Sequence, residues 1–227
     1  MKYLIIAAHP DDEVLGCGGS MVKWAKLGHD VHVLIMGEGV TSRDKERNRG
    51  ARRNDITQLG LSAQKAGKIL MNKSVELLDY PDNRMDSVDI IDVVKSIEYH
   101  IEKLKPDEVV THHLGDLNID HQIIHQAVMT ACRPTYGNTV KRILSFEVPS
   151  STEWQSVTSG NSFRPNWFEN VSESLDLKIE ALKVYQSEIR EWPHPRSLKA
   201  VEHLARWRGA TVGCDAAEAF MLNRFIN

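Results

Sequence analysis

A histidine, a proline and three consecutive acids follow the first apolar run of the chain, in the order His9, Pro10, Asp11, Asp12 and Glu13. Adjacent carboxylates repel one another, and a folded chain tolerates such a cluster best when a cation lies among them. His9 and Asp12 offer a nitrogen and an oxygen ligand, which suits zinc or a similar divalent ion, and Asp11 is then left free for proton transfer. The alternative interpretation is that the acids are the N-cap and first turn of the following helix, where aspartate is favoured.

A second polar cluster covers residues 111–121 and ends in Asp120 and His121. It also follows a predicted strand, and ligands bind where the carboxyl ends of parallel strands meet, so we expect both clusters to face the same rim of the sheet. His121 would coordinate the metal, while the neighbouring carboxylate of Asp120 would orient an imidazole. His9, Asp12 and His121 then make a three-ligand site with an open position for water, which is the pattern of a catalytic zinc site.

Four other histidines are weaker candidates. His125 lies one helical turn past His121 and would share its face. One of His112 and His113, at the end of a strand, is a further candidate for lining the site. His194 stands between two prolines, which favour a rigid loop, and it is either a proton donor or a loop residue with no role.

The elements that must position these residues alternate along the chain. Apolar runs predict strands at residues 3–8, 30–36, 68–71, 75–78, 107–113 and 143–148. Helical patterns cover 14–27, 43–59, 88–104 and 120–132, and after a long loop or short hairpin at 150–170 they return at 175–185 and 198–207. Strand–helix alternation implies right-handed crossovers. We therefore expect an α/β, Rossmann-like fold, a mainly parallel sheet flanked by helices, with a C-terminal helical extension.

The length and composition are those of an ordinary globular protein. We expect a single α/β domain in the 227 residues, with a core over about 1–148 and a loop and helical extension over 149–227 that shapes the substrate side. A net charge of -3 gives no basic footprint for nucleic acid. No apolar stretch approaches the roughly 18 residues that span a bilayer.

The cysteines and the first residues of the chain indicate the cellular compartment in which the protein is expected. Three widely spaced cysteines without a CxxC pair fit a reducing environment. The apolar start is short and runs into charged residues without a cleavage site. We expect a cytoplasmic protein with no membrane span, and a homo-oligomer.

The two polar clusters together resemble the signatures of the PIG-L/LmbE-like family of zinc-dependent N-acetylglucosaminyl de-N-acetylases. The first signature of that family, Ala-His-Pro-Asp-Asp-Glu, matches residues 8–13 in full, and the second ends in Asp-His, as residues 120–121 do. The resemblance covers residues 1–148 and, more loosely, the C-terminal part through 218–220. It implies a hydrolase that removes the N-acetyl group from an N-acetylglucosamine-type sugar or conjugate, a small-molecule substrate.

The resemblance also implies roles for the residues of both clusters. Zn²⁺, or another divalent ion such as Fe²⁺ or Co²⁺, would be bound by His9, Asp12 and His121. Asp11 would be the general base, and Asp120 would orient a histidine near the site.

Two further residues are implied to hold sugar hydroxyls. They are Asp82, in a Pro-Asp loop, and Arg49, for which Arg47 and Arg53 are alternatives.

One position departs from the family pattern. Several members carry a histidine that stabilises the oxyanion where this chain has Asn118. An amide can donate a hydrogen bond to an oxyanion but cannot deliver a proton. Either Asp11 then serves as base and later as acid, or another histidine such as His194 supplies the proton.

Other functions remain open at this point. One is a metal-dependent amidohydrolase acting on a non-sugar N-acyl amine, and another is a nucleotide- or carbohydrate-binding module without catalysis. The glycines of residues 16–19 suggest the nucleotide module, but they lack the G-x-G-x-x-G spacing and follow acids that would repel a phosphate. Trp154, Trp167 and Trp192 either stack on a sugar ring or pack against the protein.

Overall fold

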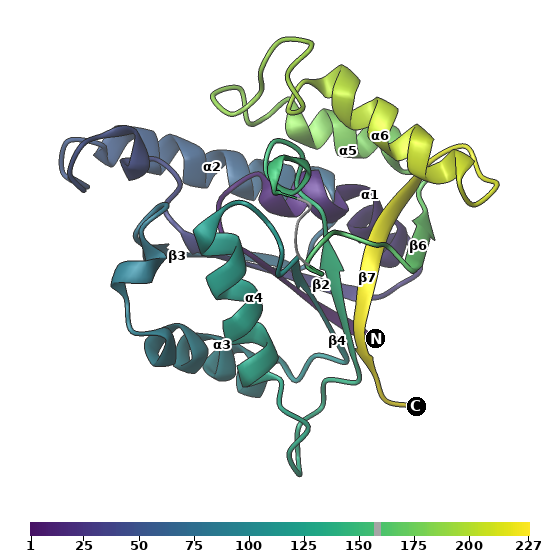
Figure 1. Ribbon diagram of the computed structural model, residues 1–227, viewed down its shortest axis with the longest axis horizontal. Coiled ribbons are helices and arrows are strands. Elements are labelled where there is room, and N and C mark those ends of the chain that lie inside the picture. The colour runs from purple at the N-terminus through teal and green to yellow at the C-terminus, as the bar shows by residue number, and fades with distance from the viewer. Residues whose placement is uncertain (157–159) are drawn as a thin grey trace.

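The computed structural model describes residues 1–156 and 160–227, and a seven-stranded sheet runs through its middle in the order β3-β2-β1-β4-β5-β7-β6 (Figure 1). The parallel strands are β1 (Lys2–Ala7), β2 (Asp30–Gly37), β3 (Ser74–Tyr80), β4 (Glu108–His112) and β5 (Arg142–Phe146). The last two, β6 (Trp167–Asn170) and β7 (Ala217–Phe225), pair antiparallel. The predicted α/β fold with a mainly parallel sheet is confirmed.

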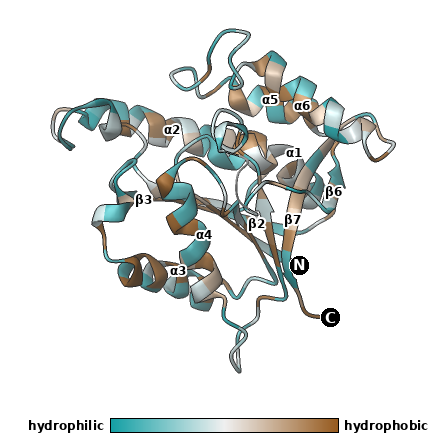
Figure 2. Cartoon of the chain, in the orientation of Figure 1, coloured by the Kyte–Doolittle hydropathy of each residue, from teal (hydrophilic) through white to brown (hydrophobic). Residues whose placement is uncertain are grey.

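Helices cover both faces of this sheet (Figure 1). One side carries α1 (Asp12–Lys26), α2 (Arg53–Ile69), α5 (Leu175–Leu182) and α6 (Leu198–Ala210), and the other carries α3 (Ile90–Leu104) and α4 (Ile119–Ala131). Figure 2 shows hydrophobic residues along the central strands and in stripes on the helices. Strands buried on both faces have continuous apolar sequences, as β1 does. Among the described residues, no helix has both the length and the apolar character needed to cross a membrane.

The helix predicted at 43–59 and the strand predicted at 68–71 are both wrong. A short 3₁₀ turn, Thr41–Arg43, is followed by a loop, and α2 begins ten residues later than predicted, at Arg53. Its buried residues Leu59, Ala63 and Ala66 and its buried C-cap Leu70 recur at helical spacing, so the apolar pair before Met71 belongs to the end of the helix.

The region after residue 148 also differs from the prediction. It contains the two expected helices, but it also supplies β6 and β7, so it completes the sheet. β6 falls inside the segment 150–170 that was predicted as a loop or hairpin, and residues 157–159 of that segment lie outside the described residues. β7 was missed because it mixes alanine, charged and aromatic residues and lacks the β-branched composition typical of strands.

Candidate active site

Two neighbouring strands bring both polar clusters to one edge of the sheet. β1 and β4 pair in parallel, with Leu4 opposite Val109, and the chain leaves both strands at the same end. His9 and Asp12 follow β1, and His121 lies in the first turn of α4 after β4. One ligand atom from each of these three side chains lies within 4.8 Å of the others. The structure therefore assembles the predicted ligand set.

Asp12 lies at the centre of this set. Its Oδ2 atom is 3.2 Å from His9 Nδ1 and 3.1 Å from His121 Nε2. Its Oδ1 atom is buried and has no hydrogen-bond partner among the described residues. An unpaired carboxylate oxygen in a buried place is unfavourable unless a cation or another donor meets it. The two nitrogens and a carboxylate oxygen of Asp12 form a ligand set that fits zinc or a similar divalent ion.

Asp120 lies behind His9 and fixes the orientation of its ring. His9 Nε2 donates to Asp120 Oδ2 over 2.9 Å, and the two oxygens of Asp120 also accept the backbone N–H groups of Asn83 and Met85. With Nε2 committed as a donor, Nδ1 is the nitrogen of His9 that faces Asp12. A carboxylate in this place selects the tautomer and raises the basicity of a metal-binding imidazole.

Asp116 lies behind His121 as Asp120 lies behind His9, and no role was predicted for it from the sequence. Its Oδ1 atom lies 3.1 Å from His121 Nδ1. Asp116 also accepts hydrogen bonds from the hydroxyls of Ser151 and Thr152 and from the backbone N–H of Asn118. Each of the two imidazoles therefore has one nitrogen toward Asp12 and the other toward a carboxylate. Its position, five residues before His121 in the second polar cluster, was the signal that could have identified it.

Asp11 is the N-cap residue of α1, but its side chain makes no capping hydrogen bond. Its backbone is left-handed, with φ at 113°, a conformation that is strained for a residue other than glycine and that is found at functional sites. The carboxylate points instead to Arg196, with 3.3 Å between Oδ2 and Nη1. The N-cap alternative therefore does not account for this side chain. Arg196 was missed because no motif surrounds it.

Burial and the opposing charges shift the pKa values of these groups in both directions. Burial lowers the pKa of His121, but Asp12 and Asp116 outweigh it and raise that pKa to about 9. Burial is also the largest influence on Asp11, and it raises the pKa of that carboxyl well above its usual range although Arg196 opposes the shift. The surroundings of the imidazoles thus favour positive charge, as a cation site requires.

The neighbouring histidines hold the backbone around the site. The ring of His112 stacks on that of His121 at 3.9 Å, but its Nε2 already accepts the N–H of Ala8. His125 donates from Nδ1 to the carbonyl of His112, and His113 contacts the carbonyl of Asn161. His112 is therefore a packing neighbour of the ligand set with its accepting nitrogen already used.

Asn118 and His194 are the two residues predicted from the sequence as sources of a hydrogen bond or a proton. Asn118 is the N-cap of α4, and its side chain accepts the N–H of Asp120 and donates to Asn83. His194 accepts the N–H of Arg196 and meets the edge of Trp154. Neither side chain points at Asp11 through a described contact, but His194 belongs to the loop that delivers Arg196.

The two predicted sugar-binding residues lie in different surroundings. Asp82 is buried, with Oδ1 3.4 Å from His9 Nε2, so it borders the ligand set. Arg49 is half exposed and pairs with Glu38 and Asp79. The arginine beside the site in this structure is thus Arg196.

The tryptophans also separate by environment. Trp167 lies in β6 under the guanidinium of Arg142 and donates to Glu169, so it is a packing residue. Trp154 and Trp192 are each about half exposed. Trp192 lies in the loop that carries Arg196 and packs against His203, and Trp154 contacts His194 of the same loop.

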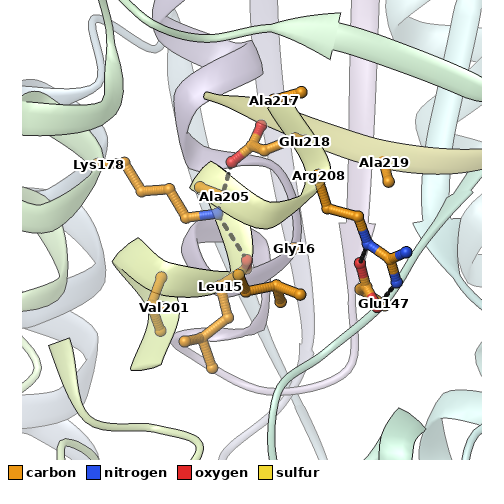
Figure 3. A pocket seen from close by; sticks show the side chains of 11 residues that line it. Leu15, Gly16, Glu147, Lys178, Val201, Ala205, Arg208, Ala217, Glu218 and Ala219 are labelled. Carbon is orange, nitrogen blue, oxygen red and sulfur yellow. Dashed lines mark hydrogen bonds and ion pairs between the residues drawn. The ribbon is translucent and has the colours of Figure 1, made fainter. Parts of the chain in front are cut away.

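Helix α1, whose first turn carries the acids, is kinked at Cys17, where φ is -147°. The kink frees backbone groups, and buried Lys178 and Glu218 from the C-terminal part bind them (Figure 3). Lys178 Nζ donates to the carbonyl of Leu15 over 2.8 Å and pairs with Glu218 at 2.6 Å, and Glu218 accepts the N–H groups of the two residues after Gly18.

The glycines of the same helix allow close packing. A Cβ atom on Gly16 would lie 2.3 Å from the ring of Phe146, and one on Gly19 would lie 2.9 Å from Val171. These glycines allow close contact with neighbouring side chains. This packing role accounts for them without a phosphate-binding loop.

Comparison with protein families and curated proteins gives consistent matches. A family model described as PIG-L, GlcNAc-PI de-N-acetylase, matches residues 4–132. The uncharacterized deacetylase YaiS of Escherichia coli is 32% identical over 190 residues, which are 81% of this chain and 90% of that protein. A diacetylchitobiose deacetylase of Thermococcus kodakarensis is 26% identical over 84% of this chain and 71% of its own length.

Comparison with solved structures supports the fold. The N,N'-diacetylchitobiose deacetylase of Pyrococcus horikoshii superposes with a TM-score of 0.77 at 19% identity, over 98% of this chain and 84% of its own. GalB of Pseudomonas putida, a 4-carboxy-2-hydroxymuconate hydratase, gives 0.76 at 23% identity over 100% of this chain and 98% of its own. Because a hydratase shares the architecture, the fold does not by itself assign the reaction.

Proposed function

Because the chain belongs to the PIG-L family, we propose that it is a zinc-dependent deacetylase acting on an N-acetylglucosamine-type sugar or conjugate. The observation that carries this proposal is the ligand set itself. His9, Asp12 and His121 converge, a carboxylate oxygen among them has no described partner, and Asp11 stands beside them without a capping role. The family description and the substrates named for the relatives support the sugar.

The reaction is hydrolysis of the acetamide. A divalent ion bound by the ligand set would polarise the amide carbonyl and lower the pKa of water toward ~7. Asp11 accepts the proton as water attacks the carbonyl carbon. When the C–N bond breaks, Asp11 returns that proton to the leaving nitrogen, and the remaining proton of the water passes from the new carboxyl group to the amine, so that acetate and a protonated amine are released. Since Asn118 cannot deliver a proton, the simplest proton transfer for this chain is one in which Asp11 acts first as the base and then as the acid.

Several residues of the chain would hold the substrate in this reaction. Asp82 borders the ligand set and offers a carboxylate to a sugar hydroxyl. Its other oxygen accepts the backbone N–H of Ser42, which fixes its position. Trp154 offers an exposed aromatic face near the loop of Arg196, suited to a sugar ring. Arg49 would contact a more distant part of the substrate after leaving its pairing with Asp79.

The test is acetate release from a panel of N-acetylglucosamine conjugates, with N-acetylated amino acids as non-sugar controls. The zinc-loaded protein should release acetate from sugars, lose this activity with a chelator and regain it when zinc is added. Acetate release from the amino acid derivatives alone would mean that the substrate is a non-sugar N-acyl amine. If no substrate of either kind releases acetate from the zinc-loaded protein, the proposed function is wrong.

A further inference from the structure

Arg196 approaches the site from outside both polar clusters. It lies in the loop between α5 and α6, and its guanidinium reaches the end of β1, where Nη1 is 3.3 Å from Asp11 Oδ2. The side chain is 25% exposed, so it is largely screened from water. A cation from the C-terminal part of the chain thus meets the proposed general base.

Besides its contact with Asp11, Arg196 makes three contacts that hold it in place. Its Nε donates to the hydroxyl of Ser150 over 2.7 Å, and its backbone N–H donates to His194 Nδ1 over 3.0 Å. Glu188 Oε2 lies 3.9 Å from the same Nη1 that meets Asp11. The guanidinium is planar and always charged, so anchoring one edge defines the direction of the other.

The side chain of Asp11 has few other contacts. Its side chain does not cap α1, and across residues 1–156 and 160–227 Arg196 is the one side chain that contacts its carboxylate by an ion pair or hydrogen bond. This contact holds Oδ2 and leaves Oδ1 for another partner. A general base works efficiently only when the accepting oxygen is held within hydrogen-bond reach of the proton.

We propose that Arg196 is a positioning residue for Asp11, which it holds in the orientation that receives the proton from water. This inference rests on the proposed function, in which Asp11 is the general base. It also assigns a role to the loop of residues 190–197: Ser150 and His194 hold Arg196, and Arg196 holds the base.

The experiment is a double-mutant cycle of Arg196→Ala and Asp11→Asn in the full chain, with Arg206→Ala as the control. Arg206 pairs with Glu202 and Asp215 on the same C-terminal part, away from Asp11. For Arg196→Ala we expect kcat to fall about 100-fold with little change in KM, because a misplacement of about 1 Å has effects of this size. Zinc content should match that of the wild-type protein.

Three readouts separate positioning from a merely structural role. If Arg196 acts through Asp11, the double variant should be no slower than Asp11→Asn alone. Methylguanidinium at millimolar concentration should restore part of the activity of Arg196→Ala and none of that of Asp11→Asn. Urea unfolding of the metal-free wild-type protein, the two single variants and the double variant should show non-additive changes in the free energy of unfolding. This tests the contact between Arg196 and Asp11 without using activity.

The outcomes distinguish this inference from the proposed function. If Asp11→Asn keeps wild-type turnover, the proposed role of Asp11 fails, and the unfolding cycle still tests the contact. If Asp11→Asn is inactive but Arg196→Ala turns over normally, or changes only KM, the positioning role is wrong. If Arg196→Ala does not fold, Ser150→Ala removes the acceptor of Nε. It should give a smaller fall in kcat, and unchanged kcat there would also contradict the proposal.

Discussion

Two buried charge clusters lie against α1, one formed by the acids before its kink at Cys17 and one formed at and after the kink by Lys178 of α5 and Glu218 of β7. They differ in balance. In the cluster after the kink, one lysine meets one glutamate, and both also satisfy backbone groups that the kink sets free. In the cluster before the kink, three acids stand in a row, and Asp12 Oδ1 has no described hydrogen-bond partner. The cluster before the kink, here the first cluster, would be completed by a cation and a substrate, whereas the cluster after the kink, the second cluster, is complete in itself.

This difference separates a structural use of buried charge from a chemical one. A buried ion pair with every donor and acceptor satisfied defines the position of a helix. A buried excess of carboxylates is unfavourable by itself and persists when the surrounding fold holds it in place. The Lys178–Glu218 pair supplies part of that support, because it fixes the helix whose first turn carries Asp11 and Asp12.

The largest effect expected on the first cluster is that of Asp11→Asn. The variant should keep its metal and lose activity by about 10²–10⁴-fold, the usual contribution of a general base. Acetate release and zinc content measured on the same sample check this. Turnover near that of the wild-type protein would remove Asp11 from the mechanism.

The second cluster should respond in stability. Lys178→Met leaves Glu218 buried without its cation, and we expect the free energy of unfolding to fall by about 3–5 kcal/mol. Urea unfolding measures it, with Lys73→Met as the control, because Lys73 pairs with Asp30 at the surface and should contribute about 0–1 kcal/mol. Equal losses in the two variants would contradict the contrast between the clusters.

Asp116→Asn tests the carboxylate behind His121. Zinc affinity should fall by about 10–100-fold, since carboxylates behind metal-binding imidazoles have effects of this size. Asp120→Asn should do the same through His9. Competition with a chromophoric chelator measures both affinities. Unchanged affinity in both variants would mean that these carboxylates do not tune the ligands.

The smallest effect concerns the packing between the two clusters. A Cβ atom on Gly16 would overlap the ring of Phe146, so Gly16→Ala should destabilise the protein by about 1–3 kcal/mol. Gly60→Ala is the matched control, since its nearest neighbour would be Leu77 at 3.9 Å, and a helical alanine there should gain up to about 1 kcal/mol. Thermal unfolding separates the two, and a stable Gly16→Ala would show that this contact adapts.

The sequence predicted the parts of the site that lie close together along the chain. His9, Asp11 and Asp12 follow one strand, and Asp120 and His121 follow another, so the rule for parallel strand ends places them together. Asp116 could have been found in the same way. Arg196 could not, because it meets Asp11 across 185 residues of chain and has no motif. Lys178 and Glu218 were hidden for the same reason.

The error at α2 arises where tertiary packing outweighs the local sequence signal. The charged run after Arg43 has the spacing of a helix, but the helix begins at Arg53 and continues through Gly60 and Gly67. Gly67 was needed there because a Cβ atom would lie 2.3 Å from Val75 of β3. Tertiary packing thus overrode the local signal that glycine ends a helix.

The central claim is that the cluster before the kink is a metal site formed by His9, Asp12 and His121. Anomalous diffraction at the zinc edge, from crystals of protein loaded with one equivalent of zinc, tests it directly. The account predicts one peak within about 2.0–2.2 Å of one atom from each of these residues. A peak among His9, Asp82 and Asp120, the other such set of side chains found in residues 1–156 and 160–227, would contradict it, and so would the absence of a peak at this edge of the sheet.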